Sequence, residues 1–126
     1  MKKYKGKFDL EERLIEFSLS VITIVEILPK TSVGRHFANQ LIRSGTAPAL
    51  QYAEAQSAES RRDFIHKMKI SLKELRETQV CLKIIQRKPL IDKSKLINTT
   101  LKENNELISI FVTSIATARS NLRKST

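Results

Sequence analysis

Apolar residues recur along this chain at alternating intervals of four and three residues, the spacing that places side chains on one face of an α-helix. In the first segment six consecutive positions fit this spacing: Leu10, Leu14, Phe17, Val21, Ile24 and Leu28. Breaks in the pattern divide the chain into segments of about 20 to 30 residues, a helical length rather than a strand length. The sequence therefore predicts helices over residues 9–28, 33–57, 60–87 and 92–121, after an N-terminal tail of residues 1–8.

Residues that cap helices stand at the start of three segments. Asp9 is followed three residues later by a glutamate, which is the spacing of a capping box, and Ser60 is followed by an aspartate at the same distance. Either Thr31 or Ser32 could cap the second helix. Pro48 lies inside the second segment and should kink its helix, because proline has no N–H to donate to residue 44.

The other three apolar faces are less uniform than the first. Small residues dominate the second, so a neighbouring helix could approach it closely: Gly34, Ala38, Leu41, Gly45, Pro48, Tyr52 and Ala55. The third consists of Phe64, Met68, Leu72, Leu75 and Leu82. The fourth, interrupted by the polar Asn104, consists of Ile97, Leu101, Ile108, Phe111, Ile115, Ala118 and Leu122. Four amphipathic helices with short connections favour a single all-α domain, an antiparallel up-down-up-down four-helix bundle.

Composition agrees with one small helical domain and adds a strong positive charge. The 126 residues include only six Gly and Pro, which argues against a turn-rich β fold. The chain has 23 Lys and Arg and 13 Asp and Glu, so its net charge is +10. One cysteine excludes an internal disulfide and a cysteine zinc site. No apolar run could span a membrane, and acids follow the basic start where a secretion signal needs apolar residues, so we expect a cytoplasmic protein.

The positive charge gathers on one side of the third predicted helix. Seven residues there fall within roughly 100° of one another on a helical wheel, and we call them the basic stripe: Arg62, His66, Lys69, Lys73, Arg76, Lys83 and Arg87. A continuous row of cations matches a phosphate backbone, whose neutralisation releases counterions. The alternative is a solvated helix face without a ligand. No aromatic residues are interleaved, so contact would be to the backbone of RNA or DNA rather than to its bases.

Two smaller basic clusters could add phosphate contacts or could simply be basic chain ends. The first consists of Lys2, Lys3, Lys5 and Lys7, and the second of Arg119, Arg123 and Lys124.

Catalytic and metal-binding patterns are missing from the sequence. A di-iron bundle needs two Glu-x-x-His pairs, and this chain has one Asp63-x-x-His66 and no second pair. No nucleophile elbow and no glycine-rich phosphate loop is present. Cys81 lies about 100° or more from the centre of the apolar face, as a small interface residue would. We expect no enzymatic activity, no metal and no cofactor.

The chain has more apolar residues than the interior of one bundle requires. Exposed to water, these would form an apolar surface unusual for a small monomer, so we expect a homo-oligomer. The candidate interface residues are Ile15, Ile22, Ile70, Val80, Ile84, Leu107 and Ile110.

Several stretches of the sequence are similar to a known family. They are residues 40–46, 52–55, 60–67, 72–78, 103–108 and 113–115, the first three including Arg43-Ser44, Tyr52-Ala53-Glu54-Ala55 and Asp63-Phe64. The chain resembles, over residues 9–122, the bacterial four-helix-bundle proteins encoded in intervening sequences of 23S ribosomal RNA genes. It is also similar to the accessory variability protein of diversity-generating retroelements. It departs from the pattern at Pro48 and Gln51, which places the local geometry of the second helix in question.

The resemblance implies a homopentameric ring, and the retroelement relative implies a nucleic-acid-binding basic surface and contact with a reverse transcriptase. It does not distinguish between the two family roles. The function that we predict is therefore a non-enzymatic, oligomeric protein that binds RNA or DNA through phosphate contacts. The alternative is a structural or protein-interaction module whose basic face docks an acidic partner protein.

Overall fold

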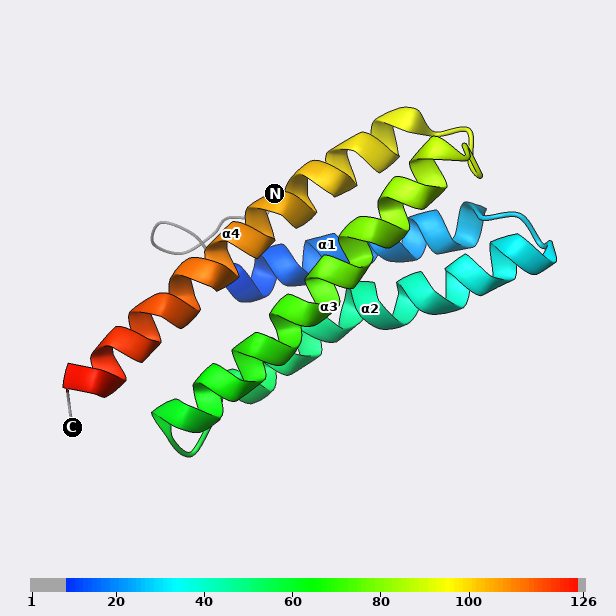
Figure 1. The fold of residues 1–126 in the computed structure, drawn as a ribbon. Coiled ribbons are helices and arrows are strands. Elements are labelled where there is room, and N and C mark those ends of the chain that lie inside the picture. The colour runs from blue at the N-terminus through cyan, green and yellow to red at the C-terminus, as the bar shows by residue number, and fades with distance from the viewer. Residues whose placement is uncertain (1–8, 125–126) are drawn as a thin grey trace.

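The computed structural model describes residues 9–124 and contains four helices joined by short connections. They are α1 (Leu10–Ile27), α2 (Ser32–Gln56), α3 (Arg61–Arg87) and α4 (Ser94–Lys124). Successive helices run in opposite directions, α1 and α2 forming one layer and α3 and α4 the other (Figure 1). The predicted all-α bundle is confirmed. The basic tail of residues 1–8 lies outside the described residues.

The predicted start signals cap the first three helices. The Asp9 carboxylate accepts a hydrogen bond from the backbone N–H of Glu12 at 3.2 Å, and the Ser60 hydroxyl accepts one from Asp63 at 3.0 Å. Of the two candidates for α2, Thr31 is the cap, since its hydroxyl oxygen accepts from the N–H of Gly34. α4 begins at Ser94, two residues later than predicted, and extends beyond residue 121.

The apolar faces meet in one core. All six residues predicted from the spacing in the first segment are buried, from Leu10 to Leu28. The largest side chains from the middle of each helix have no exposed surface or almost none: Phe17, Leu41, Leu75 and Phe111. Each helix packs against two neighbours, α1 against α2 and α4, and α3 against the same two. Within the described residues the backbones of α1 and α3 do not come close to each other, so the two helices stand diagonally across the bundle.

The small residues of α2 allow close approach, as the sequence predicts. A Cβ added at Gly45 would lie only 2.7 Å from a methyl carbon of Val21 on α1. α2 continues as one helix through Pro48, which is buried.

Polar residues also lie inside the bundle. The Thr78 hydroxyl on α3 donates to the Ser44 hydroxyl on α2 at 3.0 Å. Asn104, which interrupts the apolar face of α4, is fully buried, and its amide donates to the backbone oxygen of Leu75 and to the side chain of Gln79. No helix among residues 9–124 combines the length and the apolar character needed to cross a membrane.

Candidate nucleic-acid interface

The basic stripe lies on the side of α3 that faces away from the core. All seven of its residues are exposed, whereas Met68, Leu75 and Leu82 on the opposite side of the helix are fully buried. α3 holds eight Lys and Arg and only three acids. Two of those acids, Glu74 and Glu77, form ion pairs, and the position of their partner decides whether they neutralise the stripe.

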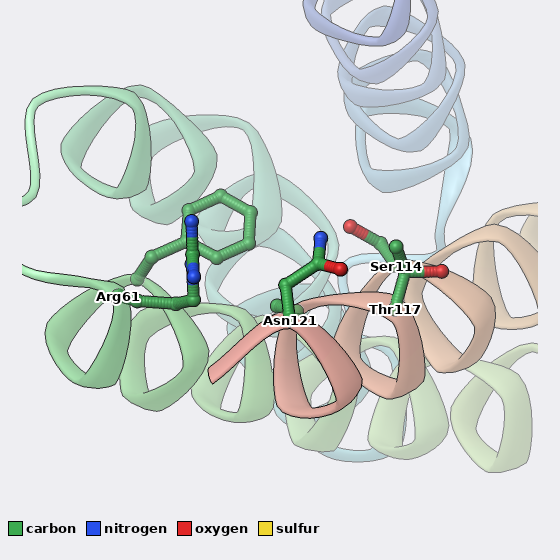
Figure 2. A pocket seen from close by; sticks show the side chains of 6 residues that line it. Arg61, Ser114, Thr117 and Asn121 are labelled. Atoms are coloured by element: carbon green, nitrogen blue, oxygen red, sulfur yellow. The ribbon is translucent and has the colours of Figure 1, made fainter. Parts of the chain in front are cut away.

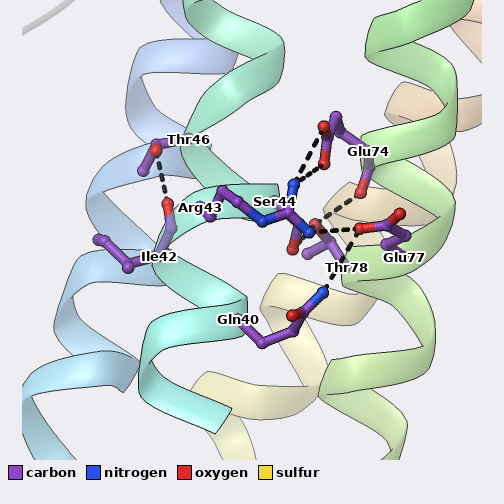
Figure 3. A network of polar contacts seen from close by, with 8 residues as sticks. All are labelled: Gln40, Ile42, Arg43, Ser44, Thr46, Glu74, Glu77 and Thr78. Carbon is purple, nitrogen blue, oxygen red and sulfur yellow. Dashed lines mark hydrogen bonds and ion pairs between the residues drawn. The ribbon is translucent and has the colours of Figure 1, made fainter. Parts of the chain in front are cut away.

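The acids of α3 that form ion pairs do so with α2 and not with the stripe. The Arg43 guanidinium lies 2.9 Å from a Glu74 oxygen and 2.7 Å from a Glu77 oxygen, and Figure 3 shows Arg43 between the two carboxylates. Hydrogen bonding to Glu77, followed by the charge of Glu74, raises the pKa of Arg43. On the same side of α3, Lys67 pairs with Glu54 of α2 at 2.8 Å.

The seven stripe residues have no such compensation. In the part of the chain that the structure describes, none of their side chains forms an ion pair or a hydrogen bond. The charges of the six Lys and Arg residues of the stripe therefore face solvent unpaired, and a polyanion can contact them without first breaking an internal pair.

Tertiary folding adds a cation from α4 to the N-terminal end of the stripe. A surface depression there is lined by Arg62, Ile65, His66, Lys69, Arg119 and Leu122. The sequence placed Arg119 in a separate C-terminal cluster. Because α3 and α4 are antiparallel, the end of α4 lies beside the start of α3 (Figure 1). Arg119 therefore lines the same depression as Arg62 and Lys69 and joins the stripe. No periodicity within one helix could have revealed this neighbour.

A second cleft opens at the same end of the bundle between α3 and α4. It is lined by Arg61, Phe64, Ser114, Thr117, Ala118 and Asn121, and in Figure 2 the Arg61 and Asn121 side chains stand beside it. None of these six residues is His, Cys, Asp or Glu, so the cleft offers neither a general base nor an acidic metal ligand. Among the described residues no group of His, Cys, Asp and Glu could hold a metal ion.

Cys81, predicted from its helical phase to be a small interface residue, belongs to the core of the single chain. It is buried between α3 and its neighbours, because α3 packs against both α2 and α4 and buries a wider arc than one apolar row. Burial raises the pKa of the Cys81 thiol to about 11, which keeps it protonated at neutral pH.

The candidate oligomer residues fall into three groups. Ile15, Val80 and Ile84 are exposed, and Ile22, Ile70 and Ile110 are partly buried. The prediction that Leu107 lies at the oligomer interface is wrong, because this residue is fully buried within the chain and cannot contact a second copy. It follows Asn104 by three residues and precedes Phe111 by four, so it shares their buried face of α4. Leu19, an exposed residue four positions after Ile15, was not among the predicted residues.

These features define the class of protein: an all-α four-helix bundle with an exposed, uncompensated basic face. The model of the family described as 23S rRNA-intervening sequence protein matches residues 7–113. The chain belongs to this family. Its fold is similar to the crystal structure of a protein with unknown function from the S23 ribosomal protein family of Bacteroides thetaiotaomicron VPI-5482. The TM-score is 0.78 at 26% sequence identity, with 85% of this chain and 98% of that chain covered. A search of curated proteins found no match.

Proposed function

We propose that this protein is a non-enzymatic homo-oligomer that binds RNA or DNA through phosphate contacts made by the basic stripe and Arg119. The observation that supports the proposal most is the one-sided pairing of α3. Its acids Glu74 and Glu77 pair toward α2, and the exposed cations on the other side have no partner among residues 9–124. Each phosphate that such a cation neutralises releases a condensed counterion, which favours binding.

Oligomerisation would strengthen this binding by repeating the stripe. Linked sites convert later contacts into intramolecular ones, so several weak phosphate contacts act together. The resemblance to the intervening-sequence and retroelement proteins implies a pentamer. Because the family description names 23S rRNA intervening sequences, RNA is the first ligand to test. The same proposal includes a role as partner of a reverse transcriptase. A 23S rRNA gene next to the coding sequence would indicate the intervening-sequence role, and a reverse transcriptase gene there would indicate the retroelement role.

The test measures binding of the full chain to fluorescently labelled random-sequence RNA and duplex DNA over a range of salt concentrations. The site variant replaces Arg62, Lys69 and Arg119 with Gln. A control variant replaces Lys93, Lys95 and Lys102 with Gln, which removes the same charge from exposed positions elsewhere. The site variant should bind all sequences more weakly, and its slope of log affinity against log salt should flatten by up to about one unit for each lost contact.

The control separates local contact from overall charge. It should retain most of the wild-type affinity and slope. If the site and control variants lose affinity equally, only the net charge matters and the proposed surface is wrong. If the wild-type protein binds neither RNA nor DNA, the interaction-module alternative replaces the proposal.

A further inference from the structure

The outward face of α1 has exposed acids, in contrast to the basic stripe on α3. α1 contains four glutamates and one arginine, Arg13, which pairs with Glu103 of α4 at 2.7 Å and with Glu106 at 3.0 Å. Among residues 9–124, the face opposite its buried residues therefore has the exposed Glu11 and Glu26 and no unpaired cation. In a chain of net charge +10, these two exposed carboxylates distinguish this face from the basic stripe.

Apolar residues occupy the centre of that face. One row follows at intervals of four, four, three and four residues: Glu11, Ile15, Leu19, Ile22 and Glu26. Leu19 is 52% exposed and lies on the side of the helix away from the core. The row thus has an acid at each end and an apolar centre, and it spans about 22 Å at 1.5 Å per residue.

The C-terminal half of α3 has the complementary arrangement. Val80, which is 57% exposed, and Ile84 form its apolar centre. Cations surround this centre along the helix: Lys73 and Arg76 come before Val80, Lys83 lies between Val80 and Ile84, and Arg87 follows Ile84. The distance from the first to the last of them is about 21 Å. Phe37 of α2 lines a groove beside Val80 and Ile84, so the surface also has a depression for an apolar side chain.

The two faces point away from each other, because among the described residues α1 and α3 stand diagonally across the bundle. They cannot satisfy each other within one chain. Two copies can bring them together in a head-to-tail contact, which leaves one free face of each kind at the ends and allows further copies to add. Association between chains of charge +10 is opposed by repulsion, so a contact between surfaces of opposite sign is favoured over one between like surfaces.

We propose that the outward face of α1 in one copy docks on the C-terminal half of α3 in a second copy. This inference rests on the proposed homo-oligomer and names the surfaces that form it. It also divides the basic stripe: Lys73, Arg76, Lys83 and Arg87 lie at the contact between copies, and the depression at Arg62, His66, Lys69 and Arg119 stays open to phosphate.

The test uses two variants that each disable one face. Leu19→Lys with Glu26→Lys changes α1, and Val80→Glu with Lys83→Glu changes α3, all at positions exposed in the single chain. A control variant combines Leu50→Lys, at a residue 67% exposed on α2, with Lys102→Glu on α4. Far-UV circular dichroism and thermal unfolding establish that each variant is folded, and analytical ultracentrifugation gives its mass.

The decisive sample is the mixture of the two face variants. Each alone should sediment as one 14.4 kDa chain, whereas an equimolar mixture should form a dimer of one chain of each kind, since each supplies the face that the other lacks. The control should assemble as the wild type does. Suppose that the wild type is oligomeric. If the mixture nevertheless stays monomeric, or if either face variant assembles alone, the head-to-tail pairing is wrong. A monomeric wild type overturns the proposed oligomer as well. Added acidic amphipathic peptides provide a further outcome. If they bind to the α1 face variant, whose α3 face is intact, but do not bind to the α3 face variant, the occupant of the α3 face is a foreign helix.

The same samples separate this inference from nucleic-acid binding. The variant with Gln at Arg62, Lys69 and Arg119 should assemble like the wild type, because those residues lie outside the contact. If it loses assembly, the division of the stripe is wrong.

Discussion

The contact between α1 and α2 at Gly45 makes the packing of this bundle testable with one methyl group. A Cβ at position 45 would lie 2.7 and 2.8 Å from the two methyl carbons of Val21, whose side chain has no exposed surface. Over-packing a core of this density costs about 1–3 kcal/mol, while alanine in a helix interior is favoured over glycine by about 1 kcal/mol. Gly45→Ala should therefore lower the free energy of unfolding by up to about 2 kcal/mol.

The companion substitution Val21→Ala removes both methyl carbons and should reverse the effect of Gly45→Ala. Alone it should cost about 2–3 kcal/mol, for two lost methyl groups and the cavity that they leave. In its presence the new methyl at residue 45 has the Cβ of residue 21 as its nearest neighbour, at 3.2 Å, so Gly45→Ala should be neutral or stabilise the protein by up to about 1 kcal/mol. The expected coupling energy between the two positions is about 1–3 kcal/mol.

Urea denaturation of the wild type, both single variants and the double variant, followed by far-UV circular dichroism, completes this cycle. The slope of free energy against urea should be the same for all four chains if each unfolds in two states. An equal effect of Gly45→Ala in both backgrounds would show that Val21 does not limit the space at this position, and the close approach of α1 and α2 would be refuted.

Three further predictions concern the core. Alanine at any one of four fully or almost fully buried positions should lower the free energy of unfolding by about 2–5 kcal/mol, and these are Phe17, Leu41, Leu75 and Phe111. Arg62→Ala should cost less than about 1 kcal/mol, and equal losses in urea denaturation would mean that the buried faces are misassigned. The Cys81 thiol should react with a disulfide reagent near neutral pH far more slowly in the folded chain than in urea, because burial raises its pKa to about 11; equal rates would contradict its burial. Asn104→Ala should destabilise the protein, measured as a lower midpoint in urea, because it removes two hydrogen bonds and a buried side chain; an unchanged midpoint would show that neither matters.

Local signals in the sequence were sufficient to predict the four helices and most of the core residues. Asp9, Thr31 and Ser60 cap their helices through hydrogen bonds within three residues, which depend on no other part of the fold. The apolar face of α1 and the exposed arc of the basic stripe follow from helical periodicity alone, since 3.6 residues per turn decides which side chains share a face. The stripe is therefore visible in the sequence, although its function is not.

The tertiary structure decided which faces meet and how wide they are. Leu107 and Cys81 are buried because α4 and α3 each pack against two neighbours, a width that no single helix encodes. Arg119 joins Arg62 because antiparallel packing places the end of α4 beside the start of α3, residues nearly sixty positions apart. The pairing of Glu77 with Arg43 likewise needs two helices side by side. Contacts between distant segments depend on how the helices pack, and periodicity along the chain contains no information about that arrangement.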